Sequence, residues 1–259
     1  MSAGPGHGAV APGLRPAIAR GRWSSDGIDV TEAFSRGVDV DRDWMGWGAL
    51  RVLSRQAWAS GAIRDDGRVA NMERLVLVLD GALDVDCGDL GRHRVARGDA
   101  LWMGAGHGMQ SRLANASAVA PLRLLECWLQ PDRVNASPAL AVRVAGSGAD
   151  PEVGTGDPAS AAGAWITLAA VDGRKGSLPL RQQARIMAAR IDAGATLALP
   201  SGSGGRYWLE VLEGAVIADG PRLAAGDGLG WTAGGIAGPG SLTAAGVGTA
   251  WLLLFELPA

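Results

Sequence analysis

One phrase occurs twice in this chain and constrains its fold more than any other feature. The first copy begins at Val78-Leu79-Asp80-Gly81 and reaches Gly98-Asp99, and the second begins at Val211-Leu212-Glu213-Gly214 and reaches Gly226-Asp227. In each copy an apolar run ends in an acid-glycine turn, a short hairpin follows, and a glycine-aspartate turn opens another apolar strand. This order is typical of a small antiparallel barrel, so the repeat predicts two copies of one β domain.

The composition agrees with a turn-rich, mostly β protein. The chain has 259 residues, of which 40 are glycine and 47 % are hydrophobic. Tight turns need residues that tolerate positive φ, and glycine does so without a steric cost. The formal net charge is −2 and the arginines are scattered along the chain. Without a sustained basic field, we expect neither nucleic acid nor an anionic membrane as a partner.

Shifts in composition predict the domain boundaries. Residues 1–17 form a Gly/Ala/Pro tract that we interpret as a disordered lead-in, and residues 131–163 have the composition of a linker. The two domains are therefore expected at 18–130 and 164–259, with a single helical turn over Asp29–Ser35 as the one departure from β structure. No apolar run reaches the ~18 residues that cross a bilayer, and no signal-peptide core is visible, which predicts a cytoplasmic protein.

Several motifs resemble successive signatures of a known family. They are Asp43-Trp44-Met45-Gly46-Trp47-Gly48, Met72-Glu73, Trp102-Met103-Gly104-Ala105-Gly106-His107-Gly108 and Cys127-Trp128-Leu129-Gln130-Pro131 in the first half, and Trp208-Leu209-Glu210-Val211-Leu212-Glu213-Gly214 in the second. Together they resemble the pirin family, in its bacterial, quercetin 2,3-dioxygenase-like branch. The resemblance covers nearly the whole chain after about residue 20. It implies a bicupin, with two jelly-roll-like β-barrel cupin domains in tandem.

The resemblance also implies where a metal site would stand in the first barrel. The family carries His-x-His before the Met-Glu strand and His-x-Glu after the Gly-x-Gly turn. Counted along this sequence, those four positions are Gly67 and Val69, then Ser111 and Leu113. Glycine, valine and leucine have no donor atom, and one serine hydroxyl is a weak neutral ligand. We therefore predict no metal and no other cofactor, and a former pocket at these positions that is more apolar and open.

Other side chains offer an alternative, a rebuilt site. The candidates for pocket polar groups are Glu73, His107 and Glu126, which Cys127 or Asp65 and Asp66 could join to hold Fe, Ni, Mn or Cu. Against this, a carboxylate enclosed in a barrel is more often paired with an arginine or with backbone donors. His93 is interpreted as a turn residue, His7 lies in the lead-in, and Cys87 and Cys127 are interpreted as idle thiols rather than a disulfide or metal pair.

The sequence thus leaves more than one function open. We expect a pirin-like pseudoenzyme, without catalytic residues, whose degenerate metal site leaves a scaffold for a hydrophobic or aromatic small molecule or for a protein partner. The alternative is a ring-cleaving oxygenase of the quercetin 2,3-dioxygenase type with a rebuilt metal site. A third hypothesis follows the eukaryotic members of the family, which act as transcriptional cofactors by binding other proteins.

Overall fold

The computed structural model describes residues 13–37, 40–145, 163–171, 173, 176–200 and 205–259. In this part of the chain the strands form two large and two small sheets, and three short 3-10 helices occur. The helices are η1 (Ala17–Ala19), η2 (Arg42–Trp44) and η3 (Gly88–Leu90). The protein is therefore mostly β, as the repeat predicted.

The first barrel pairs a seven-stranded sheet with a four-stranded one. In spatial order, the large sheet consists of β12 (Ala139–Arg143), β9 (Ala100–Gly104), β6 (Glu73–Asp80), β11 (Leu122–Leu129), β4 (Leu50–Trp58), β3 (Ile28–Glu32) and β2 (Gly21–Ser25). The small sheet consists of β5 (Ile63–Val69), β10 (Met109–Asn115), β7 (Ala82–Asp86) and β8 (Arg92–Ala96). Ile28–Glu32 is thus a strand, and the helical turn predicted for that region is wrong.

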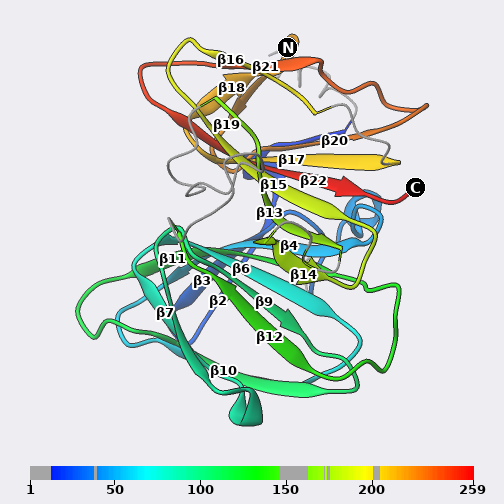
Figure 1. Cartoon of the computed structure of the whole chain (residues 1–259). Coiled ribbons are helices and arrows are strands. Elements are labelled where there is room, and N and C mark those ends of the chain that lie inside the picture. The colour runs from blue at the N-terminus through cyan, green and yellow to red at the C-terminus, as the bar shows by residue number, and fades with distance from the viewer. Residues whose placement is uncertain (1–12, 38–39, 146–162, 172, 174–175, 201–204) are drawn as a thin grey trace, which may run out of the picture.

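The second barrel repeats this plan. Its large sheet consists of β1 (Leu14–Arg15), β20 (Gly228–Thr232), β17 (Arg206–Glu213), β22 (Ala250–Leu257), β15 (Arg185–Ile191), β13 (Ile166–Val171) and β14 (Leu178–Leu180). Its small sheet consists of β16 (Thr196–Ala198), β21 (Ser241–Ala244), β18 (Ala215–Ile217) and β19 (Arg222–Ala224). The two large sheets face each other across the middle of the molecule, and the small sheets lie at its two ends (Figure 1).

Three apolar cores follow from this arrangement. One fills each barrel, and the third lies between the barrels, where Leu75 and Cys127 meet Trp208 and Phe255. A strand of a large sheet therefore buries both of its faces, because alternate side chains point to opposite sides. In β6, Leu75 and Leu77 belong to the core between the barrels, whereas Val76 and Val78 belong to the first barrel's interior.

The repeated glycine-aspartate turns are built alike in the two barrels. Gly98 and Gly226 have φ of 86° and 90°, in the left-handed region that favours glycine. The Asp99 carboxylate accepts hydrogen bonds from the backbone N–H groups of Ala96 and Ala145, at 2.9 and 2.7 Å. In the second barrel, the Asp227 carboxylate accepts from Ala224 and Ala17, at 2.8 and 2.7 Å. Each aspartate therefore closes its own turn and also holds a distant segment.

Those distant segments differ from the sequence-based expectation. Leu14–Arg15, inside the predicted disordered lead-in, forms β1 and pairs with β20 of the second barrel. Ala139–Arg143, inside the predicted linker, forms β12 and pairs with β9. Both are short edge strands that pair with the strand after a glycine-aspartate turn, so the partner strand supplies order that their own composition does not. The rest of the lead-in and of the linker, residues 1–12 and 146–162, lies outside the described residues.

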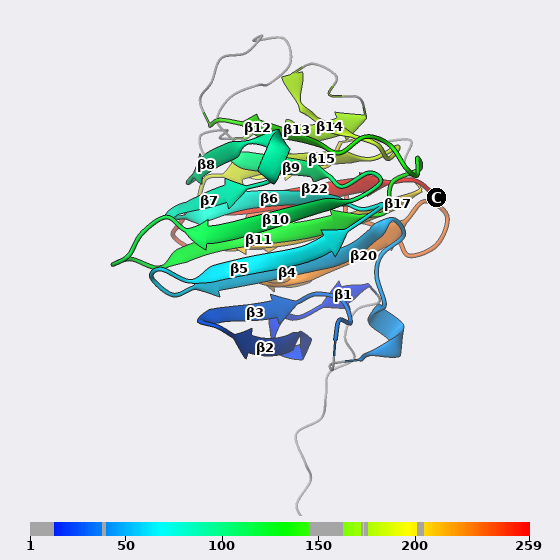
Figure 2. The ribbon, with the colours of Figure 1, turned by 90° about the horizontal axis from the view of Figure 1, so that it is seen from below.

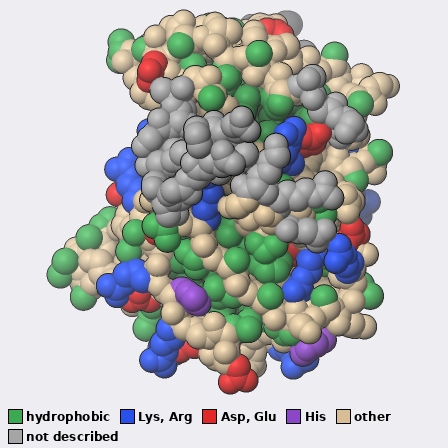
Figure 3. Space-filling view, viewed as in Figure 1, with side chains coloured by type: hydrophobic (Ala, Val, Ile, Leu, Met, Phe, Trp, Pro, Cys, Tyr) green, Lys and Arg blue, Asp and Glu red, His purple; other side chains and the backbone are tan. Residues whose placement is uncertain are grey.

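The N-terminal segment therefore joins the two barrels. It runs along one side of the molecule, from β1 beside β20 to β2 and β3 at the edge of the first barrel (Figure 2). Arg20 leaves this segment and forms a fully buried, two-pronged ion pair with Glu210, with N–O distances of 2.8 and 2.7 Å. On the face shown in Figure 3, arginine side chains gather mainly over the lower, N-terminal half. No helix in the described residues is long and apolar enough to cross a membrane.

Candidate functional site

Polar side chains gather at one end of the first barrel's interior. Residues that pair directly on neighbouring strands point to the same face of a sheet. Glu126 of β11 pairs with Ser54 of β4, and two positions away Leu124 pairs with Gln56. Strand β6 adds Arg74 to this inner face, and strands β5 and β10 of the small sheet close over it. The residues that meet there, which we call the arginine–carboxylate cluster, are Gln56, Arg64, Asp66, Arg74, Ser111 and Glu126.

Arg74 lies at the centre of the cluster. Its side chain is 3 % exposed. The guanidinium donates to Glu126 Oε1 from Nε at 2.8 Å and from Nη2 at 2.5 Å. Its Nη1 lies 2.7 Å from Asp66 Oδ2 and donates to Ser111 Oγ at 3.2 Å. The Ser111 hydroxyl in turn donates to Asp66 Oδ2 at 3.1 Å. One guanidinium thus binds two carboxylates and a hydroxyl that come from three different strands.

Arg64 closes the cluster from the small sheet. Its Nη2 lies 3.1 Å from Glu126 Oε2, and its Nε lies 3.0 Å from Asp66 Oδ1. Gln56 donates to the same Glu126 oxygen at 2.7 Å and accepts from Arg64 Nη1 at 3.0 Å. The indole N–H of Trp58 also donates to Gln56, at 2.9 Å. The cluster is therefore a connected network with two positive and two negative charges.

The charges around Glu126 determine its protonation. Burial alone would raise the pKa of this carboxyl group. The positive charges of Arg74 and Arg64 and the hydrogen bonds from Arg74 outweigh burial and hold the pKa far below its usual range. Glu126 is therefore an anion at neutral pH, in contrast to the protonated or poised carboxyl group that an acid–base catalyst needs.

The four predicted former metal-ligand positions do not converge on one place in the structure. Ser111 is in the cluster, whereas Leu113 is fully buried among the apolar side chains of the barrel. Val69 packs against the same apolar core, and Gly67 is exposed with no atom within 4 Å of a Cβ placed on it. The pairing of β10 with β5 shifts between Met109 and Ser111. Leu113 and Val69 thus lie in an apolar surrounding, as expected, whereas Ser111 lies at the charged end of the barrel, so the four positions do not line one pocket.

Of the predicted pocket polar groups, Glu126 lies in the cluster and Glu73 does not. Glu73 precedes Arg74 on β6, so its side chain points to the opposite face, between the barrels. There its Oε1 accepts from Trp102 Nε1 at 2.9 Å and from the backbone N–H of Arg181 at 2.7 Å. Burial raises the pKa of Glu73, and these hydrogen bonds oppose the rise only in part. The prediction that Glu73 and Glu126 lie in one pocket is therefore wrong. Glu73 is adjacent to Arg74 on β6, and adjacent residues of a strand point to opposite faces of the sheet.

The remaining candidates lie apart from the cluster. His107 is exposed at the Gly-x-Gly turn, and Asp65 is an exposed partner of Arg112 at 3.2 Å. Both cysteines are free and buried, and burial raises the pKa of Cys87 to about 11 and that of Cys127 further still. Thiols that stay protonated at neutral pH are poor nucleophiles and poor metal ligands.

The donor set does not fit the metal that the resemblance implies. In the described part of the chain, no three His, Cys, Asp or Glu side chains converge in a way that could hold a metal ion. The two carboxylates that do face one another, Glu126 and Asp66, are already bridged by Arg74 and Arg64. A divalent cation at this place would meet two guanidinium groups, which repel it and compete for the same oxygens.

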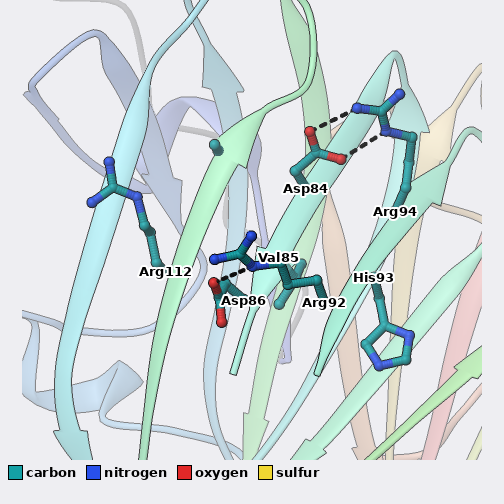
Figure 4. A pocket seen from close by; sticks show the side chains of 8 residues that line it. Asp84, Val85, Asp86, Arg92, His93, Arg94 and Arg112 are labelled. Atoms are coloured by element: carbon teal, nitrogen blue, oxygen red, sulfur yellow. Dashed lines mark hydrogen bonds and ion pairs between the residues drawn. The ribbon is translucent and has the colours of Figure 1, made fainter. Parts of the chain in front are cut away.

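Two open grooves lie on the first barrel, and one of them borders the cluster. One, of about 670 Å³, lies at the mouth of the first barrel, where Asp66, Ser111 and His107 contribute to its lining. The other, of about 480 Å³, lies over β7, β8 and β10 (Figure 4). Asp84 pairs there with Arg94 and Asp86 with Arg92, both at 2.7 Å, and Arg112 lies 3.2 Å from Asp65. These exposed pairs are solvated and contribute little to stability.

Sequence reasoning did not identify the two arginines of the cluster. Arg74 interrupts the apolar run from Leu75 to Leu79 at its start, and Arg64 precedes a pair of aspartates. The signal that was available is the alternation along β6, which places Arg74 on the same face as Val76 and Val78. Asp66 was considered only as a possible metal ligand, and the structure pairs it with arginines instead.

Comparisons with known proteins agree with this architecture. The profile of the quercetinase C-terminal cupin domain matches residues 167–257. A pirin-like protein of Caulobacter vibrioides is 29 % identical over 198 residues, 76 % of this chain and 80 % of that protein. Quercetin 2,3-dioxygenase of Escherichia coli K12 is 24 % identical over 216 residues, 83 % of this chain and 87 % of that protein.

Solved structures share the fold. The crystal structure of YhhW from Escherichia coli has a TM-score of 0.81 at 23 % identity and covers 95 % of this chain and 97 % of that chain. A structure of bacterial pirin YhhW in complex with nickel(II) has a TM-score of 0.80 at 23 % identity and covers 95 % and 98 % of the two chains. Two tandem barrels of this kind define a bicupin.

Together with the matched C-terminal cupin profile, these relatives support a pirin-family bicupin, as the sequence motifs indicate. The predicted fold class is confirmed.

Proposed function

We propose that this chain is a cytoplasmic, metal-independent pirin-family scaffold whose first barrel carries out no oxygenase reaction and which acts by binding another molecule. The observation that supports this is the arginine–carboxylate cluster. Arg74 binds Ser111, one of the positions where the resemblance places a ligand, and Glu126, which was a candidate for a rebuilt site. A polar network that is already satisfied has little free-energy reason to recruit a metal ion.

The packing of the barrels bears on what the scaffold would bind. The second barrel has an apolar core, and the core of the first barrel contains apolar side chains beside the cluster. A hydrophobic or aromatic small molecule inside a barrel would have to displace these side chains. We therefore favour a protein partner, which meets the outside of the molecule, over a small molecule held within it.

Metal content and oxygen uptake test this proposal. Untagged protein that has been purified without chelators is analysed for Fe, Ni, Mn and Cu by plasma mass spectrometry, and oxygen uptake with quercetin is followed before and after each metal is added. We expect well under one equivalent of any metal and no uptake. Near-stoichiometric metal together with metal-dependent uptake would instead support the alternative, a ring-cleaving oxygenase with a rebuilt site.

A positive control shows that the assay can detect a restored site. The variant Gly67→His/Val69→His/Ser111→His/Leu113→Glu replaces all four predicted ligand positions. A second version adds Arg74→Ala, because the Arg74 guanidinium contacts the side chain at position 111. We expect the variant with all five substitutions to bind metal more strongly than the variant with four. If the variant with five substitutions folds and takes up no metal, these positions do not form the site.

A further inference from the structure

The arginine–carboxylate cluster balances its charge without help from solvent or an ion. Glu126 and Arg74 are almost completely buried, and Asp66 is 15 % exposed. Burying a charge is expensive unless it is paired and hydrogen-bonded, and removal of one partner leaves the other uncompensated. The two carboxylates therefore require a cation between them, and that cation is a side chain.

The fold itself does not require this cluster. The repeat aligns Asp80-Gly81 with Glu213-Gly214, so Arg74 corresponds to Tyr207. The strand registers then match Glu126, which pairs with Val76, to Leu254, which pairs with Leu209. Tyr207 and Leu254 are buried in the apolar interior of the second barrel. The second barrel thus has the same topology with no charged side chain at these two positions. The charges of Arg74 and Glu126 in the first barrel therefore need an explanation other than the fold.

We propose that the Arg74 guanidinium is the resident cation of the first barrel, and that the space it fills is a cation site that accepts an external cation when the side chain is removed. The oxygens that would line this site are those that now bind the guanidinium, from Glu126, Asp66 and Ser111. Carboxylate and hydroxyl oxygens suit guanidinium and hard divalent cations such as Mn²⁺.

The geometry supports a site for a cation rather than a packing contact alone. Three nitrogens of one guanidinium are directed to oxygens of β5, β10 and β11, at 2.5 to 3.2 Å. The aromatic ring of Trp128 lies against the same group, with its centroid 5.0 Å from the guanidinium carbon of Arg74. An aromatic face attracts a cation through its quadrupole. Without the Arg74 side chain, the remaining charges are one positive and two negative, so the site would attract a cation.

Chemical rescue of Arg74→Ala tests the inference. We expect this variant to melt well below the wild type, and millimolar guanidinium or Mn²⁺ to raise its Tm by about 5 °C or more in a saturable way, because a ligand that binds only the folded state stabilises it. Urea is the control for guanidinium, since it has a similar shape and no charge. Arg94→Ala, which removes the arginine of an exposed pair, is the control variant.

The possible outcomes separate clearly. Rescue of Arg74→Ala by guanidinium or Mn²⁺, but not by urea or sodium at equal ionic strength, supports the inference. A folded Arg74→Ala that neither cation rescues, or equal rescue of Arg94→Ala, overturns it. These measurements concern a variant, so they stand apart from the metal content of the wild-type chain, which tests the proposed function.

If Arg74→Ala does not fold, a second pair of variants tests whether Arg74 acts through its charge or through its bulk. Arg74→Lys keeps a positive charge in a shorter side chain, whereas Arg74→Met keeps apolar bulk without the charge. If Arg74 acts as a cation, Arg74→Lys should melt several degrees above Arg74→Met. An Arg74→Met protein that is as stable as Arg74→Lys, or more stable, would show that position 74 serves packing alone.

Discussion

The two barrels of this protein share a fold and differ in what fills them. At matching ladder positions, Arg74 and Glu126 of the first barrel correspond to Tyr207 and Leu254 of the second. The strand β15 continues the difference, because Met187 pairs with Leu254 where Ser54 of the first barrel pairs with Glu126. The second interior is wholly apolar among its described core residues, and the first is divided into an apolar and a charged half.

This difference shows that the fold itself does not require the charged cluster of the first barrel. Well-packed apolar side chains often stabilise a protein at least as well as a buried ion pair of similar volume. The second barrel shows that solution in the same molecule. The charged side chains of the first barrel are therefore a feature of that barrel and not a requirement of the fold.

The largest expected effect comes from making the first barrel resemble the second at one position. Glu126→Leu installs the residue found at position 254 and leaves Arg74 and Arg64 without their shared carboxylate. We expect the free energy of unfolding to fall by about 3–5 kcal/mol at neutral pH, as measured by urea denaturation. Adding Arg74→Tyr should recover part of this loss, because the two arginines would otherwise share Asp66 as their one remaining carboxylate in the cluster. A loss below about 1 kcal/mol for Glu126→Leu would mean that the charged half is dispensable.

A smaller effect should be shared by both barrels. Asp99→Ala and Asp227→Ala each remove a carboxylate that accepts two backbone N–H groups. We expect each to lower the free energy of unfolding by about 1–3 kcal/mol, since the buried amides lose their partner. Asp89→Ala, at an exposed position, serves as the control and should change stability by less than about 0.5 kcal/mol. An effect confined to one barrel would contradict the equivalence of the two turns.

The pH dependence of two buried glutamates should have opposite signs. The folded-state pKa of Glu126 is lowered, so its contribution to stability is present above the unfolded pKa of about 4.3 and is lost as the pH falls. The folded-state pKa of Glu73 is raised, so the folded state gains protons first and is stabilised as the pH falls through that raised pKa.

Glu126→Gln and Glu73→Gln measure this contrast. At neutral pH we expect Glu126→Gln to be strongly destabilised, whereas Glu73→Gln should lie within about 1 kcal/mol of the wild type, because the amide oxygen still accepts both hydrogen bonds. Towards acidic pH the deficit of Glu126→Gln should shrink, and the wild type should gain stability relative to Glu73→Gln. Denaturation curves between neutral pH and about pH 2.5 provide the measurement, because the Glu126 contribution is lost only below the unfolded pKa. Parallel pH profiles for the two variants would contradict the assignment of these pKa directions.

The smallest expected effect is that of chelation. If arginine side chains provide the positive charge in the first barrel, EDTA should leave the Tm of the wild-type protein unchanged to within about 1 °C. A protein stabilised by a bound metal loses that stabilisation when the free metal is removed. A clear fall in Tm on chelation that one particular metal reverses would show that the wild-type protein binds a stabilising metal ion, which contradicts the proposal.

The fold was predictable because its strongest signals are local. The acid-glycine and glycine-aspartate turns need only a few neighbouring residues, and their repetition was enough to predict two β-barrels. The short strands β1 and β12 were missed for the opposite reason. Their own sequences carry no strand signal, and each is ordered by pairing with a strand that is distant in sequence.

The site was predictable only in part, for a related reason. The resemblance and motif spacing gave Gly67, Val69, Ser111 and Leu113 as candidate positions, and of these the structure places Ser111 in the cluster. The rest of the cluster could not be predicted from spacing, because Arg64, Arg74 and Glu126 come from three strands whose meeting depends on the closed barrel. The shifted pairing between β10 and β5 also changes which of those positions face the interior.

The pairing of β1 with β20 has a consequence for the order in which the protein is made. Leu14 leaves the ribosome well before its partner Leu229. At ordinary rates of translation, roughly 5–20 residues per second, the two are separated by roughly 10–40 s. The first barrel can close during this interval, before β20 and Glu210 are available to β1 and Arg20. The strand of this pair that is made first is thus the one whose partner arrives late.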